Sequence, residues 1–383
     1  MSRLDELIQE LCPDGVEYRK LEDCCTVLDK KRKPVTKAAR EAGEYPYYGA
    51  NGIQDYVSDY IFDGTFVLVG EDGSVITKAG TPVVTWAEGK IWVNNHAHII
   101  EETGDVLLRY LFHYIQTIGV TPLIHGNIPK LTGRDFRALQ IPVPPLEVQR
   151  EIVRILDSFT LLTAELTAEL TARKKQYEFY RDDLLTFESD IPLLPIKEVV
   201  KKSCAGATPA KGNSEYYKGG TIPWIRTQDV RFNEITEVDS FITEKAVEET
   251  AAKWIPENCV IVAISGATAG RCAINKIKAT TNQHCLNMQI DAEKALYKYV
   301  YYCICSKQDE LISKKQGARG DLNSSLILGT KIPVPKLEIQ KKIVHVLDNF
   351  EAICTDLNIG LPAEIEARQK QYEYYRDKLL SFE

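Results

Sequence analysis

The chain has 383 residues, of which 44% are hydrophobic and 26% are charged, and its formal net charge is −7. A chain of this length and composition is expected to form two or three globular domains. No apolar run reaches the roughly 18 residues that a membrane-spanning helix needs, and the acidic N-terminus does not resemble a signal peptide. Because no secretory signal accompanies the ten cysteines, we expect reduced thiols and a cytoplasmic location.

Charge is unevenly distributed along the chain. Residues 1–140 carry 15 basic and 20 acidic side chains, a net of −5, whereas residues 201–331 carry 18 and 14, a net of +4. A local basic surface is enough to bind phosphate groups even when the whole protein is acidic. The composition therefore leaves nucleic acid open as a partner.

Residues 1–140 are predicted to form a first, mainly β domain behind a short amphipathic N-terminal helix. Strand-like runs occur at 65–69, 82–86 and 91–100, each bounded by Gly, Asp or Asn. A helix is predicted around 106–116.

This domain also contains a basic run, Lys30-Lys31-Arg32-Lys33, directly before Pro34. The proline predicts a loop. A run of this kind is either a solvated surface segment or a binding site for phosphate groups, and the sequence leaves both possibilities open.

Two stretches of the chain repeat each other. Residues 141–144, Ile-Pro-Val-Pro, return as residues 332–335, and residues 175–182, Lys-Gln-Tyr-Glu-Phe-Tyr-Arg-Asp, return almost unchanged as 370–377. The first pair is 191 residues apart and the second pair 195, so the later copy has four extra residues in its middle. Such repetition predicts a tandem in which a variable domain is followed, twice, by a long helix.

Apolar residues in both copies recur at steps of four and three, which is coiled-coil periodicity, although any long helical hairpin would show it. The four extra residues keep this seam in phase. Gly360-Leu361-Pro362 predicts a kink in the second helix, with Pro362 in the first turn of a new segment. In the first helix, Thr-Ala-Glu-Leu occurs twice in succession at 163–170. Each copy adds about 6 Å of helix, which matters if the helix sets a distance between two domains.

The second variable segment, 191–331, repeats the style of the first. Strands are predicted at 222–227 and 259–264, and helices near 244–252 and 294–307. Asn94-Asn95-His96 resembles Asn282-Gln283-His284, and Val67-Leu68-Val69 resembles Ile261-Val262-Ala263. The two segments are thus predicted to share one backbone arrangement, which we call the frame, and to differ in the polar residues that it carries.

Motifs for catalysis are missing. The double proline Pro144-Pro145 lacks the flanks of a methyltransferase motif, and Gly266 to Arg271 lacks the Lys-Ser/Thr ending of a phosphate loop. His96 and His98 would point to one face of a strand, so a metal site is conceivable, but no third ligand is near and a packed or DNA-facing pair is favoured. We expect a binding protein that holds no cofactor itself.

On these motifs, the whole chain resembles the specificity (S) subunit of type I restriction-modification systems. The resemblance rests on the two Ile-Pro-Val-Pro segments, the Arg-Lys-Lys-Gln-Tyr and Arg-Gln-Lys-Gln-Tyr helix ends, the Thr-Ala-Glu-Leu repeat, and residues 265–270 with 281–283. It implies an α+β fold in which two β-rich target-recognition domains are separated by two long antiparallel coiled-coil-like helices in a pseudo-twofold arrangement. The corresponding domains are 1–140, 141–190, 191–331 and 332–383.

The resemblance also implies a function. Members of that family recognise a bipartite sequence in double-stranded DNA and recruit two methyltransferase (M) subunits and two restriction (R) subunits, with no membrane involved. The partner subunits would hold S-adenosylmethionine, ATP and magnesium. Two domains with one frame and different polar residues predict an asymmetric target, with half-sites roughly one helical turn, about 34 Å, apart.

Base recognition needs polar side chains on loops at strand ends. In the first domain the predicted DNA-binding residues are Tyr48, Asn51, Trp86, Asn94, His96, Asn127 and Lys130. In the second domain they are Arg226, Thr227, Thr268, Arg271, Asn282, Gln316 and Arg319. The tyrosines predicted to dock partner helices are Tyr177, Tyr180, Tyr372 and Tyr375.

Two other functions compete with DNA recognition. A coiled-coil scaffold with two protein- or ligand-binding domains would show the same helices. A single-chain modification enzyme is disfavoured because the cofactor loop is missing.

Overall fold

The computed structural model describes residues 3–73, 75–125, 129–188, 190–315, 321–356 and 358–382. They divide into two compact units. The first unit comprises Met1–Thr167 and Glu364–Glu383, and the second comprises Ala168–Ala363. The C-terminal helix therefore belongs to the same unit as the N-terminal domain.

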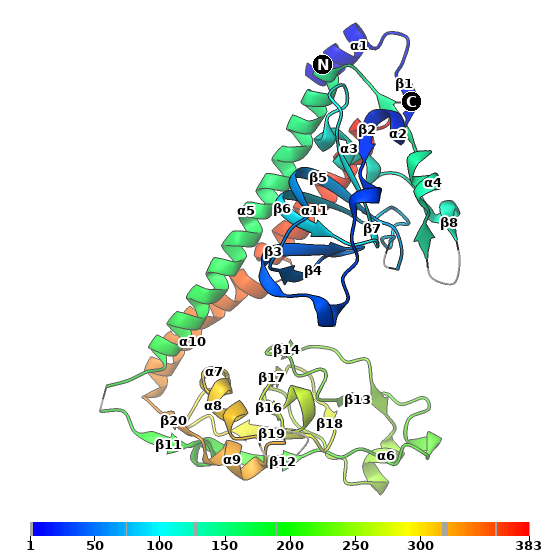
Figure 1. Ribbon diagram of the computed structural model, residues 1–383. Helices are drawn as coiled ribbons and strands as arrows, with labels where there is room; N and C mark the ends of the chain where they lie inside the picture. Colours follow the sequence, from blue (N-terminus) through cyan, green and yellow to red (C-terminus); the bar gives the residue numbers. More distant parts are fainter. Residues whose placement is uncertain are drawn as a thin grey trace. The chain divides into compact units, whose positions relative to one another are not determined.

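Among the described residues, the core of the first unit is a six-stranded sheet with the order β2-β7-β5-β6-β3-β4 (Figure 1). Its strands are β2 (Cys25–Val27), β3 (Ala42–Gly49), β4 (Gly52–Val57), β5 (Phe62–Gly70), β6 (Val84–Val93) and β7 (Ala97–Glu102). The central strand β5 ends in a fully apolar run, and Val67 and Val69 pack against Tyr110 and Leu111 of α3 (Leu108–Ile115). This burial of β-branched side chains against a helix holds the sheet.

Shorter elements complete the first unit. They are α1 (Arg3–Leu11), β1 (Glu17–Lys20), α2 (Leu21–Cys24), the 3₁₀ turns η1 (Asp29–Lys31), η2 (Lys37–Ala39) and η3 (Thr121–Leu123), β8 (Ile124–His125), β9 (Lys130–Leu131), α4 (Gly133–Arg137) and β10 (Gln140–Val143). β1 pairs with β10 antiparallel, so the repeated Ile-Pro-Val-Pro segment closes the domain. Thr132 caps α4 because its side chain accepts a hydrogen bond from the Asp135 amide.

The second unit has a five-stranded sheet, β12-β19-β16-β17-β14, and a three-stranded sheet, β15-β13-β18, in the part that the structure describes. Its strands are β11 (Leu193–Pro195), β12 (Val200–Ala205), β13 (Ile222–Ile225), β14 (Glu234–Ile235), β15 (Phe241–Ile242), β16 (Val260–Ala263), β17 (Cys272–Asn275), β18 (Thr280–Thr281), β19 (Cys285–Ile290) and β20 (Lys331–Pro333). Its short helices are η4 (Ile196–Val199), η5 (Ser214–Tyr216), α6 (Glu244–Glu249), η6 (Gly266–Thr268), α7 (Tyr297–Ser306), α8 (Gln308–Ser313) and α9 (Ser324–Gly329). β11 pairs with β20 as β1 pairs with β10.

The two repeated stretches form long helices. The first is the continuous helix α5 (Leu146–Leu184), which begins in the first unit and ends in the second. The second copy is divided into α10 (Leu337–Thr355) and α11 (Leu361–Leu379). The predicted kink is thus a complete break, and Pro362 lies in the first turn of α11 as expected. A Cβ atom at Gly360 would lie 2.6 Å from the carbonyl oxygen of Ala352, so the tight connection needs glycine.

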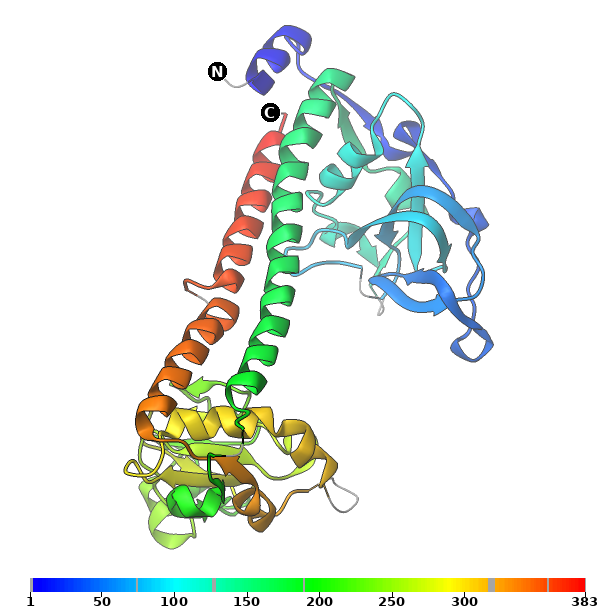
Figure 2. The ribbon, with the colours of Figure 1, turned by 90° about the vertical axis from the view of Figure 1, so that its left-hand side faces the viewer.

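Each unit pairs one half of α5 with a different part of the second copy (Figure 2). In the first unit, Phe159 of α5 stacks on Tyr375 of α11, with ring centroids 5.3 Å apart. In the second unit, Tyr180 of α5 packs on Phe350 of α10 at 5.5 Å. Phe159 and Phe350 are equivalent positions of the repeat, so the same ring contact occurs once in each unit.

Further contacts of the repeat recur in the same way. The side-chain amide of Gln149 donates to the carbonyl of Pro144 (2.8 Å), and that of Gln340 donates to the carbonyl of Pro335 (2.8 Å). Both glutamines also accept a hydrogen bond from a backbone amide at the N-terminus of a domain helix, Leu107 at α3 or Leu296 at α7. These buried amides fix each long helix to its own domain, because a buried polar group without its partners is costly.

Two of the expected strand boundaries were wrong. The runs 82–86 and 91–100 are not separate strands: β6 continues through Val93, and a turn at 94–96 precedes β7. The turn forms because the Asn94 side chain accepts a hydrogen bond from the His96 amide (2.8 Å). The steps of four and three place Val346 in the apolar seam of the second long helix, but Val346 is 38% exposed, whereas Leu347 and the equivalent Leu156 are fully buried. Contacts with the recognition domain, and not only contacts between the paired helices, determine which face of each long helix is buried.

In the described ranges, no helix combines the length and the apolar character that crossing a bilayer requires.

Candidate nucleic-acid interface

Four chain segments of the first unit meet at one edge of its sheet. The amide of Asn94 donates to the carbonyl of Tyr48 (3.0 Å), and the amide of Glu71 donates to the carbonyl of His96 (2.8 Å). The carbonyl of Glu71 in turn accepts from the amide of Leu131 (2.8 Å). The segments after β3, after β5, before β7 and around β9 are therefore linked by backbone bonds into one cluster, which we call the first loop cluster.

The same frame occurs in the second unit. The amide of Asn282 donates to the carbonyl of Ile225 (3.0 Å), and the amide of Ile264 donates to the carbonyl of His284 (2.8 Å). The carbonyl of Ile264 accepts from the amide of Leu322 (2.8 Å). We call this arrangement the second loop cluster. The predicted equivalence of Asn94-Asn95-His96 and Asn282-Gln283-His284 thus extends to their backbone hydrogen bonds.

A buried ionic network supports the first loop cluster. His98 is fully buried and stacks on Phe136, with ring centroids 4.2 Å apart. Its Nδ1 lies 2.8 Å from Asp29 Oδ2, and its Nε2 lies 3.0 Å from the carbonyl oxygen of Leu131. Both ring nitrogens therefore lie within hydrogen-bond distance of an oxygen atom. Burial raises the pKa of Asp29, but the hydrogen bond from His98 and the charges of His98 and Arg32 outweigh it and hold that pKa below its usual value.

The network continues to the cluster itself. Arg32 places a guanidinium nitrogen 2.6 Å from Glu71 Oε2, and Lys130 places its ammonium 3.2 Å from Glu71 Oε1. Asp72, the next residue, contacts the exposed ring of His96. The polar surface of the first loop cluster therefore combines acidic, imidazole and ammonium groups, and the buried ionic network fixes their positions.

The second loop cluster is supported differently. Asp321 accepts hydrogen bonds from the Ser265 hydroxyl (2.6 Å) and from the Gly266 amide (3.2 Å). The hydroxyl of Thr208 donates to the side chain of Gln283. The side-chain amide of Gln283 lies 3.2 Å from His284 Nε2. One carboxylate and several neutral polar groups thus support this cluster, whereas paired acidic and basic side chains support the cluster of the first unit.

The structure brings several predicted residues of the first domain together. Asn94, His96 and Lys130 all lie in the first loop cluster, with Tyr48 and Asn51 at the β3–β4 turn beside it. Tyr48 and Asn94 are buried, 7% and 2% exposed, so their side chains support the cluster, whereas Asn51 and His96 are exposed.

Trp86 is not brought to the cluster, and Asn127 lies outside the described residues. The Trp86 indole packs edge-on against Phe112 of α3 and lies under the guanidinium of Arg109, 4.7 Å from its ring centre. The side chains at the predicted His96-x-His98 pair also do not share a face, because His96 precedes β7 and His98 is inside it. Among the described residues no group of three His, Cys, Asp or Glu side chains has the arrangement of a metal site.

In the second domain, Arg226, Thr227, Thr268 and Asn282 lie in or directly beside the second loop cluster. Arg226 is half-buried at the end of β13, and its Nε is buried with no hydrogen-bond partner in the described part of the chain. Arg271 lies just before β17, and its amide donates to the carbonyl of Thr268 (3.0 Å). Gln316 and Arg319 lie outside the described residues.

Sequence reasoning missed several residues of these clusters. They are Arg32, Asp72, Thr208, Gln283, His284 and Asp321. The resemblance of Asn94-Asn95-His96 to Asn282-Gln283-His284 would have identified Gln283 and His284. Arg32, Thr208 and Asp321 reach the clusters only through the fold.

The predicted docking tyrosines fall into two groups. Tyr177 and Tyr372 are turned inward, and burial raises the pKa of both hydroxyl groups. Tyr372 bonds to His113 Nδ1 at 2.9 Å. Tyr180 and Tyr375 are 38% and 39% exposed.

The most exposed aromatic side chains of these helix ends were not predicted. Phe179 is 66% exposed and Tyr374 is 62% exposed. Phe179 packs edge-on against Tyr180, and Tyr374 against Tyr375, with ring centroids 5.5 and 5.3 Å apart. We call these two pairs the aromatic pairs.

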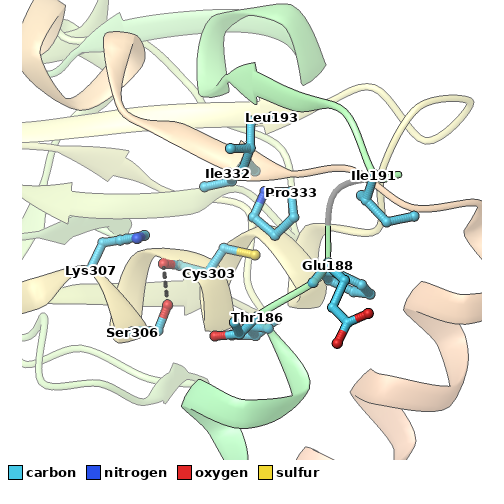
Figure 3. Close-up of a pocket in the computed structure, with 11 residues that line it drawn as sticks. Thr186, Glu188, Ile191, Leu193, Cys303, Ser306, Lys307, Ile332 and Pro333 are labelled. Carbon is cyan, nitrogen blue, oxygen red and sulfur yellow. Dashed lines mark hydrogen bonds between the residues drawn. The ribbon is translucent and has the colours of Figure 1, made fainter.

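A cavity of about 290 Å³ lies in the second unit where α5 leads into β11 (Figure 3). Leu193, Ile332 and Pro333 form part of its wall, and the Ser306 hydroxyl beside it donates to the carbonyl of Cys303 (3.0 Å). None of the predicted DNA-binding residues that the structure describes lines it. The loop clusters are therefore separate from this cavity.

Comparison with known proteins agrees with this architecture. The family model for the type I restriction modification DNA specificity domain matches the chain twice, at residues 13–173 and 189–367. The chain belongs to this specificity family. A type I restriction enzyme specificity subunit of Haemophilus influenzae is 34% identical over 384 residues, which cover 96% of each chain. A type I specificity subunit of Escherichia coli is 38% identical over 295 residues, covering 73% of this chain and 72% of that protein.

Solved structures of specificity subunits share the fold. The type I S subunit from M. genitalium superposes with a TM-score of 0.56 at 14% identity, with 96% of each chain covered. A chain from a structure described as showing complex assembly and conformational transition of the type I restriction-modification system gives a TM-score of 0.60 at 16% identity, covering 96% of this chain and 98% of that one. The predicted α+β fold with two specificity domains in tandem is thus confirmed.

Proposed function

We propose that this specificity subunit recognises an asymmetric, bipartite sequence in duplex DNA, with each loop cluster contacting one half-site. The observation that supports this most directly is that one hydrogen-bonded frame occurs once in each unit with different polar side chains on it. His96, Asp72 and Lys130 stand on the first frame. On the second, His284 takes the position of His96, but its ring lies beside the Gln283 amide, whereas the ring of His96 contacts Asp72.

Different donors and acceptors at equivalent positions predict different bases. Base pairs present distinct hydrogen-bonding patterns in the major groove, so a carboxylate, an amide and an ammonium select different edges. A single frame accounts for a common docking geometry on the phosphate backbone. Two frames in one chain then give two unlike half-sites.

The chain is proposed to be non-catalytic and to hold no cofactor, with methylation and cleavage performed by partner subunits. The aromatic pairs support this division of labour. Exposed apolar patches of this kind are typical of protein contact sites. Because the pairs are equivalent positions of an internal repeat, they favour two copies of one partner, which we propose to be the methyltransferase subunit. Two restriction subunits would join that complex.

Selection from a randomised duplex library tests the proposed function. The full chain, alone and with methyltransferase subunits, should enrich one split sequence with two unlike halves and a fixed gap. Failure to enrich any sequence over a range of salt concentrations would falsify DNA recognition and would favour a scaffold that binds proteins. Replacing residues 191–331 by the same region of a relative should change one half-site and leave the other intact.

A further inference from the structure

Three exposed lysines of the first unit lie beside its loop cluster. Lys30, Lys31 and Lys33 are exposed. Across the described ranges, none of the three takes part in an ion pair with N–O separation up to 4.0 Å. The remaining residue of this basic run, Arg32, is turned inward onto Glu71 and the carbonyl of Ala97, each 2.6 Å away. Arg32 therefore acts as an anchor, and the lysines stay free to bind a ligand.

Backbone bonds place these lysines at the rim of the first loop cluster. The amide of Lys33 donates to the carbonyl of Val93 (3.3 Å), the residue directly before Asn94. The indole of Trp92 donates to the carbonyl of Lys33 (2.7 Å). The lysine backbone is thus tied on both sides to the strand that leads into the cluster. Held in this way, the segment loses side-chain freedom but little backbone freedom when the lysines bind.

The equivalent segment of the second unit is uncharged. There the amide of Ala207 donates to the carbonyl of Thr281 (2.9 Å), the residue directly before Asn282. Residues 205–209 are Ala-Gly-Ala-Thr-Pro. A Cβ atom at Gly206 would lie 2.1 Å from the Thr281 carbonyl oxygen, so this segment lies tightly against the strand. At this position of the shared frame, the first unit is therefore basic and the second unit is uncharged.

We propose that Lys30, Lys31 and Lys33 bind DNA phosphates on the flank of the half-site recognised by the first unit, and that the second unit has no counterpart. The inference rests on the proposed function. Lysine ammonium groups bind phosphate as point charges, and such contacts position a protein on the duplex without selecting bases. The first unit then supplies the larger share of the salt-dependent affinity, and the second unit depends more on base contacts.

Salt-dependent binding of the full chain to a duplex that carries its selected target tests this. Each phosphate contact contributes about 0.9 to the slope of log affinity against log salt. K30Q/K31Q/K33Q should therefore give a slope shallower by about 2–3, with the sequence preference unchanged. K30R/K31R/K33R keeps the charges and should retain the wild-type slope.

A matched control separates local contacts from overall charge. Lys197, Lys201 and Lys202 of the second unit are exposed, and Lys202 pairs with Gln289, at the end of β19 remote from His284. K197Q/K201Q/K202Q changes the net charge equally and should leave the slope close to that of the wild type. An unchanged slope in K30Q/K31Q/K33Q, or an equal loss in both triple variants, overturns the inference.

Phosphate-ethylation interference locates the contacts. K30Q/K31Q/K33Q should lose interference on the backbone of one half-site only, and loss at both half-sites contradicts the proposed asymmetry. If the wild-type chain selects no sequence at any salt concentration, the proposed function itself fails. That outcome is distinct from a wild type that selects a target while the lysine variant keeps its slope.

Discussion

Gly206 shows how one residue can determine the position of a recognition loop. Its amide donates to the carbonyl of Cys285, and its α-carbon is so close to the next strand that a Cβ would lie 2.1 Å from the Thr281 carbonyl and 2.4 Å from that of Asn282. Real Cβ atoms do not approach that closely, and the atoms in question are backbone, which cannot rotate away. The second loop cluster therefore depends on the absence of a side chain at this position.

We expect Gly206→Ala to destabilise the second unit by about 1–3 kcal/mol, the usual cost of forcing an extra carbon into a packed site. It should also weaken selection of one half-site, because residues 281–284 must move. Thermal denaturation and library selection measure the two effects. Gly212→Ala is the control, since a Cβ there meets nothing within 4 Å. Equal behaviour of the two variants would show that the close approach has no role.

His113 connects three helices of the first unit. Its ring is fully buried, with Nε2 2.8 Å from Asp157 of α5 and Nδ1 2.9 Å from the Tyr372 hydroxyl of α11. Burial lowers the pKa of His113, although the hydrogen bond to Asp157 opposes this; Arg109 and Arg376 lower it further. The folded protein therefore favours the neutral ring.

This predicts acid sensitivity of the α11 contact. A lowered pKa means that the unfolded chain binds the proton more readily, near its ordinary pKa of about 6.5. The stabilisation is complete above about pH 6.5 and is lost as the pH falls toward the folded-state pKa. The melting temperature of the wild type should decrease more between about pH 7.5 and 5.5 than that of His113→Gln, which cannot titrate in this range. Parallel pH profiles would contradict the prediction.

At the residue scale, the sequence predicted which residues come together in the loop clusters better than it predicted their contacts. The Asn-Asn-His and Asn-Gln-His turns were recognisable because local side-chain capping leaves a sequence signature. Trp86 was not predictable as a packing residue, because its contacts with Phe112 and Arg109 form only after the sheet and α3 come together. Arg32 likewise finds Glu71 only through the fold.

At the scale of elements, the helix ends combine a buried and an exposed aromatic face. Tyr177 and Tyr372 point into their units, while Phe179 and Tyr374, two residues further on, point outward. Residues two apart on a helix lie roughly on opposite sides, so both faces come from one repeated motif. The periodicity predicted the helices, but the outward face was not identifiable until the packing of the recognition domains was known.

Replacing one exposed ring should remove one partner. Because Phe179 and Tyr374 are 66% and 62% exposed, Phe179→Ser and Tyr374→Ser should change the folding stability by less than about 1 kcal/mol. Each single variant is expected to bind one methyltransferase subunit in place of two, and the double variant none. Native mass spectrometry of the reconstituted complex counts the subunits.

Leu161→Ser serves as the control for this experiment, because Leu161 is similarly exposed at 62% but belongs to neither aromatic pair. It lies two residues from Phe159, on roughly the opposite side of α5 from the ring that stacks on Tyr375. The control variant should leave the stoichiometry at two. A double variant that still binds two subunits would remove the aromatic pairs from the docking surface.

At the scale of the whole molecule, the chain is a tandem whose second copy returns its last helix to the first unit. The division between the units falls in α5 between Thr167 and Ala168, inside the Thr-Ala-Glu-Leu repeat. α5 is nevertheless one uninterrupted helix of 39 residues. A continuous helix transmits a change of length from one end to the other, because each residue adds a fixed 1.5 Å.

Deleting Thr167–Leu170 removes one copy of the repeat, leaves the other intact, and shortens α5 by about 6 Å. We expect the preferred gap between the half-sites to change by about 1–2 base pairs, since neighbouring base pairs are about 3.4 Å apart. Neither half-site should change, because no residue of either loop cluster is touched. The measurement is library selection with the deletion variant and the wild type side by side.

Length can be separated from sequence by a variant of unchanged length. Replacing Thr167 and Glu169 by alanine and glutamine keeps all 39 residues of the helix, and both substitutions are compatible with helix formation. This variant should select the wild-type gap. If it alters the gap while the deletion does not, the tetrapeptide acts through its side chains, and α5 is not the spacer. If only the deletion alters the gap, the length of α5 determines the spacing of the two half-sites.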